Sequence, residues 1–362
     1  MTSTDDQIPL VFRYGLHRVR DAVRVLPQAA WSVESNPALC DGQDYELLLD
    51  VERLNIDAAS FRQMEEAARA TGGDVDAGVR KQILDTVDKR GKMHNPVTGS
   101  GGMLLGRVRH VGRKLSPSHH TLQPGDRVAT LVSLSLTPLQ IERILSVNLH
   151  AHQVSIIGSA ILFDSGCYAR LPPTLPESVA LSALDVAGAA PQVARLCHDP
   201  RPSKRVRRVL VLGAGGKSGL LVGAAARKAG AEVVVGIESF AKAANEAAAL
   251  GIYDRILPAD AADALAIADL ACSDGGEYDL VISCVSAPRA EMAAILCCRQ
   301  GGTIYFFSMA TSFTAAALGA EGVSRDIDML IGNGYCLGHA DETLQLLQEH
   351  TPLRELFVRR YG

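Results

Sequence analysis

One segment constrains the fold of this chain more than any other, because an apolar run passes directly into a glycine-rich turn. Residues 208–212 read RVLVL, residues 213–219 read GAGGKSG, and an apolar helical pattern follows to Ala229. A strand, a glycine turn and a helix in this order form the phosphate-binding unit of dinucleotide folds, in which the helix N-terminus faces the pyrophosphate. We therefore predict a dinucleotide-binding domain. The predicted cofactor contacts in this turn are Gly213, Gly215, Gly216, Lys217, Ser218 and Gly219.

The next predicted strand, residues 232–237, indicates which dinucleotide is preferred. It ends at Glu238, which lies 238 − 213 = 25 residues after Gly213. A carboxylate at this place can accept hydrogen bonds from the hydroxyls of the adenosine ribose and would repel a 2′-phosphate, so NAD is favoured over NADP. Three residues at or near strand ends are expected to complete the cofactor site: Ser239, Cys284 and Ser308. Cys284 has no adjacent base, so packing is the better prediction for it than a nucleophilic role.

Two other interpretations of the glycine turn remain open at this point. The ending Gly216-Lys217-Ser218 is that of a nucleoside-triphosphate P-loop, but the glycine required five residues earlier is replaced by Val211. The usual spacing of dinucleotide glycines also places Ser218 where the third glycine is expected, and Gly219 comes one residue later. We interpret the turn as a variant dinucleotide motif. The other alternative is a glycine turn that binds no ligand.

The rest of the chain divides into two regions with different residue patterns. Up to Pro176, short apolar runs rich in glycine and proline predict strands at 46–54, 104–111 and 127–134, with a helix at 74–89, as in a small β-rich domain. From Glu177 onward, strands and helices alternate, which predicts a parallel, doubly wound sheet. The elements predicted there are a buried helix at 178–196, helices at 219–229 and 242–250, and strands at 208–212, 232–237, 280–285 and 303–308. Residues 341–361 are predicted as an amphipathic helix with a short extended tail.

The composition excludes several function classes. Hydrophobic residues make up 47% and charged residues 21% of the 362, and the net charge is −4, so a globular protein is expected without a nucleic-acid or membrane surface. The N-terminus is polar from Thr2 to Asp6, which argues against a signal peptide. The eight cysteines form no C-x-x-C pair, so we expect neither a zinc cage nor a disulfide framework. A reduced, cytoplasmic compartment fits these features best.

Shorter strings resemble the medium-chain dehydrogenase/reductase superfamily. They are PGDRV at 124–128, LLGRV at 104–108, LP at 171–172 and GGTIYFFS at 301–308. Longer strings resemble one branch, the family of L-erythro-3,5-diaminohexanoate dehydrogenases of lysine fermentation. These include GLHRV at 15–19, VLPQ at 25–28, LNIDAASF at 54–61, KMHNPVTGSGGM at 92–103, ATLVSLSLTP at 129–138, LDVAGA at 184–189 and YFFSMATSF at 305–313. The resemblance covers nearly the whole chain.

The resemblance implies an α/β fold with a GroES-like β-barrel catalytic domain and a Rossmann domain. On this basis the first domain spans residues 1–176 with a C-terminal return at 341–362, and the Rossmann domain spans 177–340. It also implies NAD(P)-dependent oxidative deamination of the amino acid at C3, giving 5-amino-3-oxohexanoate and ammonium, by a homodimer or homotetramer. A zinc-free carbonyl or enone reductase of the superfamily and a dinucleotide-sensing binding protein are the alternatives.

Zinc-dependent members of the superfamily carry cysteine and histidine ligands where this chain has Gly102, Met103 and Leu184. Catalytic zinc needs three protein ligands, so no metal is expected. The acid–base steps must then use ordinary side chains, and the candidates are Asp57, Asp185 and His94. Asp57 could instead cap a helix, Asp185 could form an ion pair, and His94 could be an ordinary loop residue. The candidates for substrate binding are Asn55, Ser60, Thr98 and Ser100.

Overall fold

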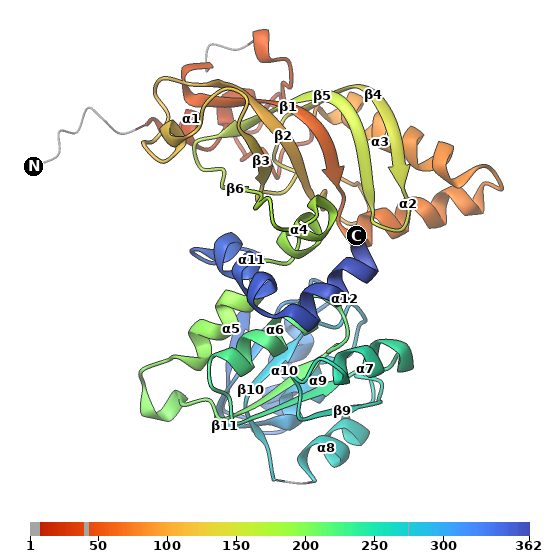
Figure 1. Cartoon of the computed structure of the whole chain (residues 1–362), viewed down its shortest axis with the longest axis vertical. Helices are drawn as coiled ribbons and strands as arrows, with labels where there is room; N and C mark the ends of the chain where they lie inside the picture. Colours follow the sequence, from red (N-terminus) through yellow and green to blue (C-terminus); the bar gives the residue numbers. More distant parts are fainter. Residues whose placement is uncertain (1–7, 40–42, 274) are drawn as a thin grey trace, which may run out of the picture. The chain divides into compact units, whose positions relative to one another are not determined.

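The computed structural model describes residues 8–39, 43–273 and 275–362, which fall into two compact units (Figure 1). The first unit runs to Pro173 and includes Tyr361, and the second unit comprises Thr174–Arg360 with Gly362. The polar stretch from Thr2 to Asp6 and Cys40 lie outside the described residues. Among the helices of the described part, none is both long and apolar enough to cross a lipid bilayer.

The first unit is built on a six-stranded antiparallel sheet with the strand order β4-β5-β1-β2-β3-β6. The strands are β1 (Glu46–Asn55), β2 (Met103–Val111), β3 (Arg127–Thr130), β4 (Leu139–Asn148), β5 (Gln153–Phe163) and β6 (Tyr168–Arg170). Alternate side chains of β1, among them Leu47 and Leu49, are fully buried in the core, as the period of a half-buried strand requires. The predicted strands at 46–54 and 104–111 are confirmed, and the one at 127–134 is confirmed in its first half.

Two helices pack together on this sheet, α2 (Ala58–Ala70) and α3 (Val75–Arg90). Each begins at an aspartate that accepts a hydrogen bond from a first-turn amide, Asp57 for α2 and Asp74 for α3. The helix predicted at 74–89 is confirmed, whereas α2 was not predicted because its sequence follows β1 without a turn signal. A short helix α1 (Leu10–Arg13) precedes the sheet.

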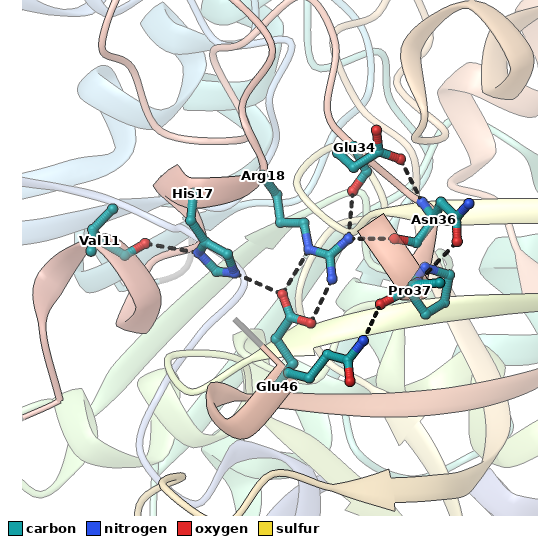
Figure 2. A network of polar contacts seen from close by, with 9 residues as sticks. Val11, His17, Arg18, Glu34, Asn36, Pro37 and Glu46 are labelled. Carbon is teal, nitrogen blue, oxygen red and sulfur yellow. Dashed lines mark hydrogen bonds and ion pairs between the residues drawn. The ribbon is translucent and has the colours of Figure 1, made fainter. Parts of the chain in front are cut away.

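A buried ion pair fastens the N-terminal segment to the start of β1 (Figure 2). The Arg18 side chain is fully buried, and its Nε and Nη2 donate to the two carboxylate oxygens of Glu46, each at 2.8 Å. His17 Nε2 lies 2.7 Å from Glu46 Oε1, and Arg18 Nη1 donates to the carbonyl oxygen of Asn36 at 2.6 Å. Bidentate pairing and two further polar contacts compensate for removing these charges from water.

The second unit is built on a six-stranded parallel sheet with the order β12-β11-β10-β7-β8-β9. Its strands are β7 (Arg208–Leu212), β8 (Val233–Ile237), β9 (Arg255–Leu257), β10 (Tyr278–Ser283), β11 (Cys298–Phe306) and β12 (Asp328–Ile331). The helices are α4 (Glu177–Leu184), α5 (Ala189–Cys197), α6 (Lys217–Lys228), α7 (Ala241–Ala248), α8 (Ala264–Cys272), α9 (Glu291–Cys297), α10 (Phe313–Gly322), α11 (His339–Glu349) and α12 (Thr351–Tyr361). The chain order reverses at β7, so the carboxyl ends of β7 and β10 flank the switch point where such sheets bind ligands.

Two expectations for this unit need correction. The single helix predicted at 178–196 is two helices, because the chain turns at 185–188 and Gly188 packs so tightly that an added Cβ would lie 2.3 Å from the carbonyl oxygen of Gly334. The predicted extended tail is α12, which buries Leu353, Leu356 and Phe357. Within the second unit, α11 packs on α4, α5 and α6, and the return of 341–362 to the first domain stays a prediction.

Candidate active site

The glycine turn lies between β7 and α6, and its backbone can be formed only by glycine at two positions. Gly213 has a φ of +80°, in the left-handed region, and its amide donates to the carbonyl oxygen of Ile237 at 2.9 Å. A Cβ on Gly219 would lie 2.1 Å from the carbonyl oxygen of Gly213. The one-residue shift of the third glycine therefore preserves its function, which is the close approach of the helix to the preceding turn.

The turn has the form that a pyrophosphate requires. The N-cap of α6 is Gly216, and no side chain of the described residues caps the helix there. The nearest atom to a Cβ built on Gly216 is 3.6 Å away, so the backbone is open at this point. Helix N-termini with glycine at the cap bind phosphate through their amides and the helix dipole. The residues present thus fit a dinucleotide, and Ser218 stands in the first turn with a partly exposed side chain.

Glu238 follows β8 and is fixed beside the turn. Its Oε2 accepts a hydrogen bond from the amide of Gly215 at 2.9 Å, and its Oε1 accepts from the amide of Phe240 at 3.0 Å. The residue is 7% exposed. Each carboxylate oxygen has two lone pairs, so both can still accept a hydroxyl. The predicted acid therefore lies against the phosphate turn, as an adenosine-binding carboxylate must.

Arg360, near the end of α12, also contacts the backbone of Gly215 and was not predicted from the sequence. Its Nη1 donates to the carbonyl oxygen of Gly215 at 2.7 Å, and its Nε donates to Glu246 of α7 at 2.9 Å. The two peptide groups that flank Gly215 are thus held by Glu238, at the amide, and by Arg360, at the carbonyl. No local signal marks this arginine, because its partners lie more than a hundred residues away in the sequence.

Asp185 and Lys217 meet in the second unit. Asp185 is the C-cap of α4, Lys217 is the first residue of α6, and Lys217 Nζ lies 2.6 Å from Asp185 Oδ2. The two side chains are 12% and 20% exposed, respectively. The predicted acid–base candidate Asp185 therefore forms an ion pair with a residue of the phosphate turn.

The remaining predicted cofactor contacts lie at or just beyond carboxyl ends of parallel strands. Ser239 is exposed after β8, and Ser308 follows β11 with its Oγ accepting from the amide of Ala310 at 3.1 Å. Cys284 follows β10, and burial raises the pKa of its thiol to about 12. At neutral pH this cysteine is a protonated thiol, which agrees with packing rather than nucleophilic catalysis.

In the first unit, the segments at 55–60 and 93–102 come together. Asp57 Oδ1 accepts from the amide of Ser60 at 2.9 Å, and Ser60 Oγ lies 2.5 Å from Thr98 Oγ1. A Cβ on Gly102 would lie 2.1 Å from the carbonyl oxygen of Asn55, so glycine is needed for this contact. Four predicted site residues thus share one region: Asn55, Asp57, Ser60 and Thr98.

Two buried polar atoms of this region have no hydrogen-bond partner among the described residues, Asp57 Oδ2 and His94 Nδ1. Asp57 caps α2 with Oδ1, whereas its Oδ2 has no hydrogen-bond partner among the described residues. The pKa of His94 is lowered to about 4 by burial, with Lys92 and Arg90 as further causes. Its imidazole is neutral at physiological pH, so it can accept or donate a hydrogen bond but carries no charge.

Asn95 organises the loop that carries the predicted substrate contacts, and sequence reasoning did not single it out. Its Oδ1 accepts from the amides of Val97 and Thr98 at 2.8 and 3.2 Å, and its Nδ2 donates to Gln63 of α2 at 2.9 Å. The amide of Asn95 also donates to the carbonyl oxygen of Ser100 at 2.8 Å. An Asn-Pro pair is typical of a turn, but the long-range hydrogen bond to Gln63 cannot be predicted from it.

The predicted substrate residue Asn55 is already engaged. Its Oδ1 accepts a hydrogen bond from Gln153 of β5 at 3.1 Å, and it is 3% exposed. Within the described residues, no three histidine, cysteine, aspartate or glutamate side chains converge as metal ligands would. The absence of a metal from the reaction remains a prediction.

The antiparallel sheet domain, the parallel sheet domain and the glycine turn together define a two-domain dehydrogenase or reductase with a nicotinamide dinucleotide site. Solved structures share this fold. An alcohol dehydrogenase from Thermotoga maritima has a TM-score of 0.54 and 17% identity, with 86% of this chain and 84% of that chain covered. A quinone oxidoreductase from Escherichia coli, solved with NADPH, has a TM-score of 0.50 and 16% identity, with 93% and 86% covered. These likenesses show the fold.

Sequence comparison identifies the family within this class. Residues 17–172 match the family model of the L-erythro-3,5-diaminohexanoate dehydrogenase N-terminal domain, and residues 219–329 match the model described as zinc-binding dehydrogenase. Two relatives are named L-erythro-3,5-diaminohexanoate dehydrogenase. The one from Acetoanaerobium sticklandii is 46% identical and the one from Fusobacterium nucleatum is 44% identical, and each alignment covers 96% of this chain and 98% of the relative. The chain belongs to the L-erythro-3,5-diaminohexanoate dehydrogenase family, as the sequence resemblance predicted.

Proposed function

We propose that this enzyme oxidatively deaminates L-erythro-3,5-diaminohexanoate at C3 with NAD, releasing 5-amino-3-oxohexanoate and ammonium. The observation that carries the proposal is the end-to-end likeness to two relatives that bear this name, both above 40% identity. The glycine turn and the carboxylates described above supply what such a reaction needs, which is a hydride acceptor site and acid–base groups.

NAD is the proposed cofactor because of Glu238. The carboxylate is held by two backbone amides at the end of β8, and a 2′-phosphate placed there would meet a fixed negative charge. The pyrophosphate would rest on the N-terminus of α6, and the bound dinucleotide would accept the hydride from C3. No zinc step is proposed, since the positions of the superfamily ligands hold Gly102, Met103 and Leu184.

The proposed acid–base residues are Asp185 in the second unit and Asp57 and His94 in the first unit. The C3 ammonium must lose a proton before hydride can leave, and a carboxylate is a suitable acceptor. Asp57 Oδ2, buried and without a partner among the described residues, would accept a hydrogen bond from a substrate ammonium group. Ser60, Thr98 and Ser100 are the proposed polar contacts, and Asn55 is proposed to shape the site through its bond to Gln153.

The initial rate of reduced-nicotinamide formation by chelator-treated enzyme tests this proposal. We expect turnover of L-erythro-3,5-diaminohexanoate with NAD, slower turnover with NADP, and no oxidation of the reduced cofactor by enones or quinones. A fast enone- or quinone-dependent rate without turnover of the amino acid would replace the proposal by a reductase. Binding of dinucleotide without any turnover would indicate a sensing protein.

A further inference from the structure

Lys217 and Asp185 both lie at the end of a helix that opposes their charge. Lys217 is the first residue of α6, where the helix dipole is positive, and Asp185 caps the C-terminus of α4, where the dipole is negative. Each side chain is thus disfavoured at its own helix end and is compensated by the other across 2.6 Å. Because both helix dipoles oppose these charges, stability alone does not explain why this ion pair is present.

The end of α4 also places Asp185 next to Lys217. Residues Val179–Leu184 of α4 are all buried, and the apolar helix stops at Asp185 instead of continuing into α5. The turn at 185–188 is fixed by two backbone hydrogen bonds: the amide of Val186 donates to the carbonyl oxygen of Ala183, and the amide of Ala187 donates to the carbonyl oxygen of Leu184, both at 3.2 Å. Asp185, the first polar residue after the buried helix α4, therefore contacts Lys217, the first residue of α6.

A phosphate anchor would be the ordinary role of a lysine in a glycine turn, but here the ammonium group is already engaged by a carboxylate. A paired ammonium offers less charge to a phosphate, whereas the phosphate has the amides of the helix N-terminus. The same ammonium holds the Asp185 carboxylate at a fixed place, where the carboxylate can accept a proton from a substrate ammonium.

We infer that Lys217 is a positioning residue of the reaction centre, which holds the Asp185 carboxylate oriented as the base, rather than an anchor for the pyrophosphate. This inference rests on the proposed function. The C3 ammonium gives a proton to the Asp185 carboxylate, and hydride then leaves C3 for the nicotinamide as the nitrogen lone pair forms the iminium. Water adds to C3 and releases one proton to solvent. The Asp185 carboxylic acid returns its proton to nitrogen, the C–N bond breaks, and the ketone and ammonium leave.

The test compares Lys217→Met, Lys217→Arg and wild type in two measurements, NADH binding by fluorescence titration and kcat and KM with L-erythro-3,5-diaminohexanoate. For Lys217→Met we expect kcat to fall about 100-fold and the Kd for NADH to change less than about threefold, because the carboxylate of Asp185 loses the partner that orients it. Lys217→Arg should recover part of kcat. Lys228→Met, at the other end of α6, removes an exposed pair with Glu349 and should match wild type.

The outcomes separate the two roles. A tenfold or greater rise in the Kd for NADH with kcat preserved at saturating NAD would make Lys217 a phosphate anchor and overturn the inference, as would a near-normal kcat of Lys217→Met with unchanged NADH binding. The NADH titration also reports whether Lys217→Met folds, and Lys217→Arg keeps the test decisive if it does not. Failure of the wild type to oxidise the amino acid would overturn the proposed function itself, whatever the variants do.

Discussion

Replacing Glu46 by glutamine should destabilise the first unit by several kcal/mol while leaving its shape unchanged. Glutamine has the same size, but it leaves the fully buried Arg18 guanidinium without a counter-charge. Breaking a buried ion pair by removing one partner costs about 3–5 kcal/mol. A domain of 150–250 residues loses about 2–4 °C of Tm per kcal/mol, so a fall between about 6 and 20 °C is expected.

Urea unfolding monitored by circular dichroism measures this change directly. The matched control is Asp85→Asn, which removes an exposed pair with Lys81 within α3 of the same unit and should leave the free energy of unfolding nearly unchanged. Adding Arg18→Met to Glu46→Gln should cost less than the sum of the single changes, since the uncompensated charge is then gone. A loss below about 1 kcal/mol for Glu46→Gln would refute the argument, because Arg18 would then have found another partner or water.

The same pair should make stability depend on pH in the acid range. Burial alone would raise the pKa of Glu46, but the hydrogen bonds and charges of His17 and Arg18 lower it below its ordinary value. A carboxyl with a depressed pKa in the folded state stabilises the fold above its unfolded pKa, and this contribution is lost as the pH falls through the folded pKa. Glu46→Gln should therefore flatten the stability profile below about pH 4.5.

Three further changes test separate parts of the structure. Gly219→Ala should abolish NADH binding by fluorescence titration, because its Cβ would lie 2.1 Å from the carbonyl oxygen of Gly213; near-normal affinity would contradict the account of the turn. Asp185→Asn should lower kcat at least 100-fold with NADH affinity retained, and near-normal turnover would remove Asp185 as the base. The pKa of His94 is about 4 in the folded protein, so as the pH falls His94 of the unfolded chain binds a proton before His94 of the folded protein does. The stability of the fold should therefore decrease by on the order of 1–2 kcal/mol between pH 6.5 and 4. In urea titrations, the stability of His94→Gln should not show this dependence on pH. An unchanged dependence would mean that another titratable group causes it.

The Rossmann half could be predicted from local sequence in most respects. The strand at 208–212 and the turn that follows are confirmed, since apolar strands and glycine turns carry their signal within a few residues. Helix breaks were harder to see. The apolar sequence of 178–196 looks continuous, and the turn at 185–188 depends on the close approach of Gly334, which is distant in the sequence.

The candidate site divides in the same way. The acid at Glu238 follows from its place after a strand, whereas the contacts of Arg360 with Gly215 and Glu246 depend on how α12 packs within the second unit. Asn95 was passed over because its partner Gln63 belongs to α2, a helix for which Asp57 was only a possible cap and which no turn signal preceded. The pairing of Asp185 with Lys217 was left open as one of two roles, and only the fold shows which cation it meets.

The transfer of label from substrate to cofactor tests the central claim most directly. The enzyme should be incubated with L-erythro-3,5-diaminohexanoate deuterated at C3 and with NAD, and the reduced cofactor and ammonium should be quantified together. The account predicts one deuterium at C4 of the nicotinamide and one ammonium for each NADH formed. Reduced cofactor without deuterium, or formed without an equal amount of ammonium, would contradict oxidative deamination at C3.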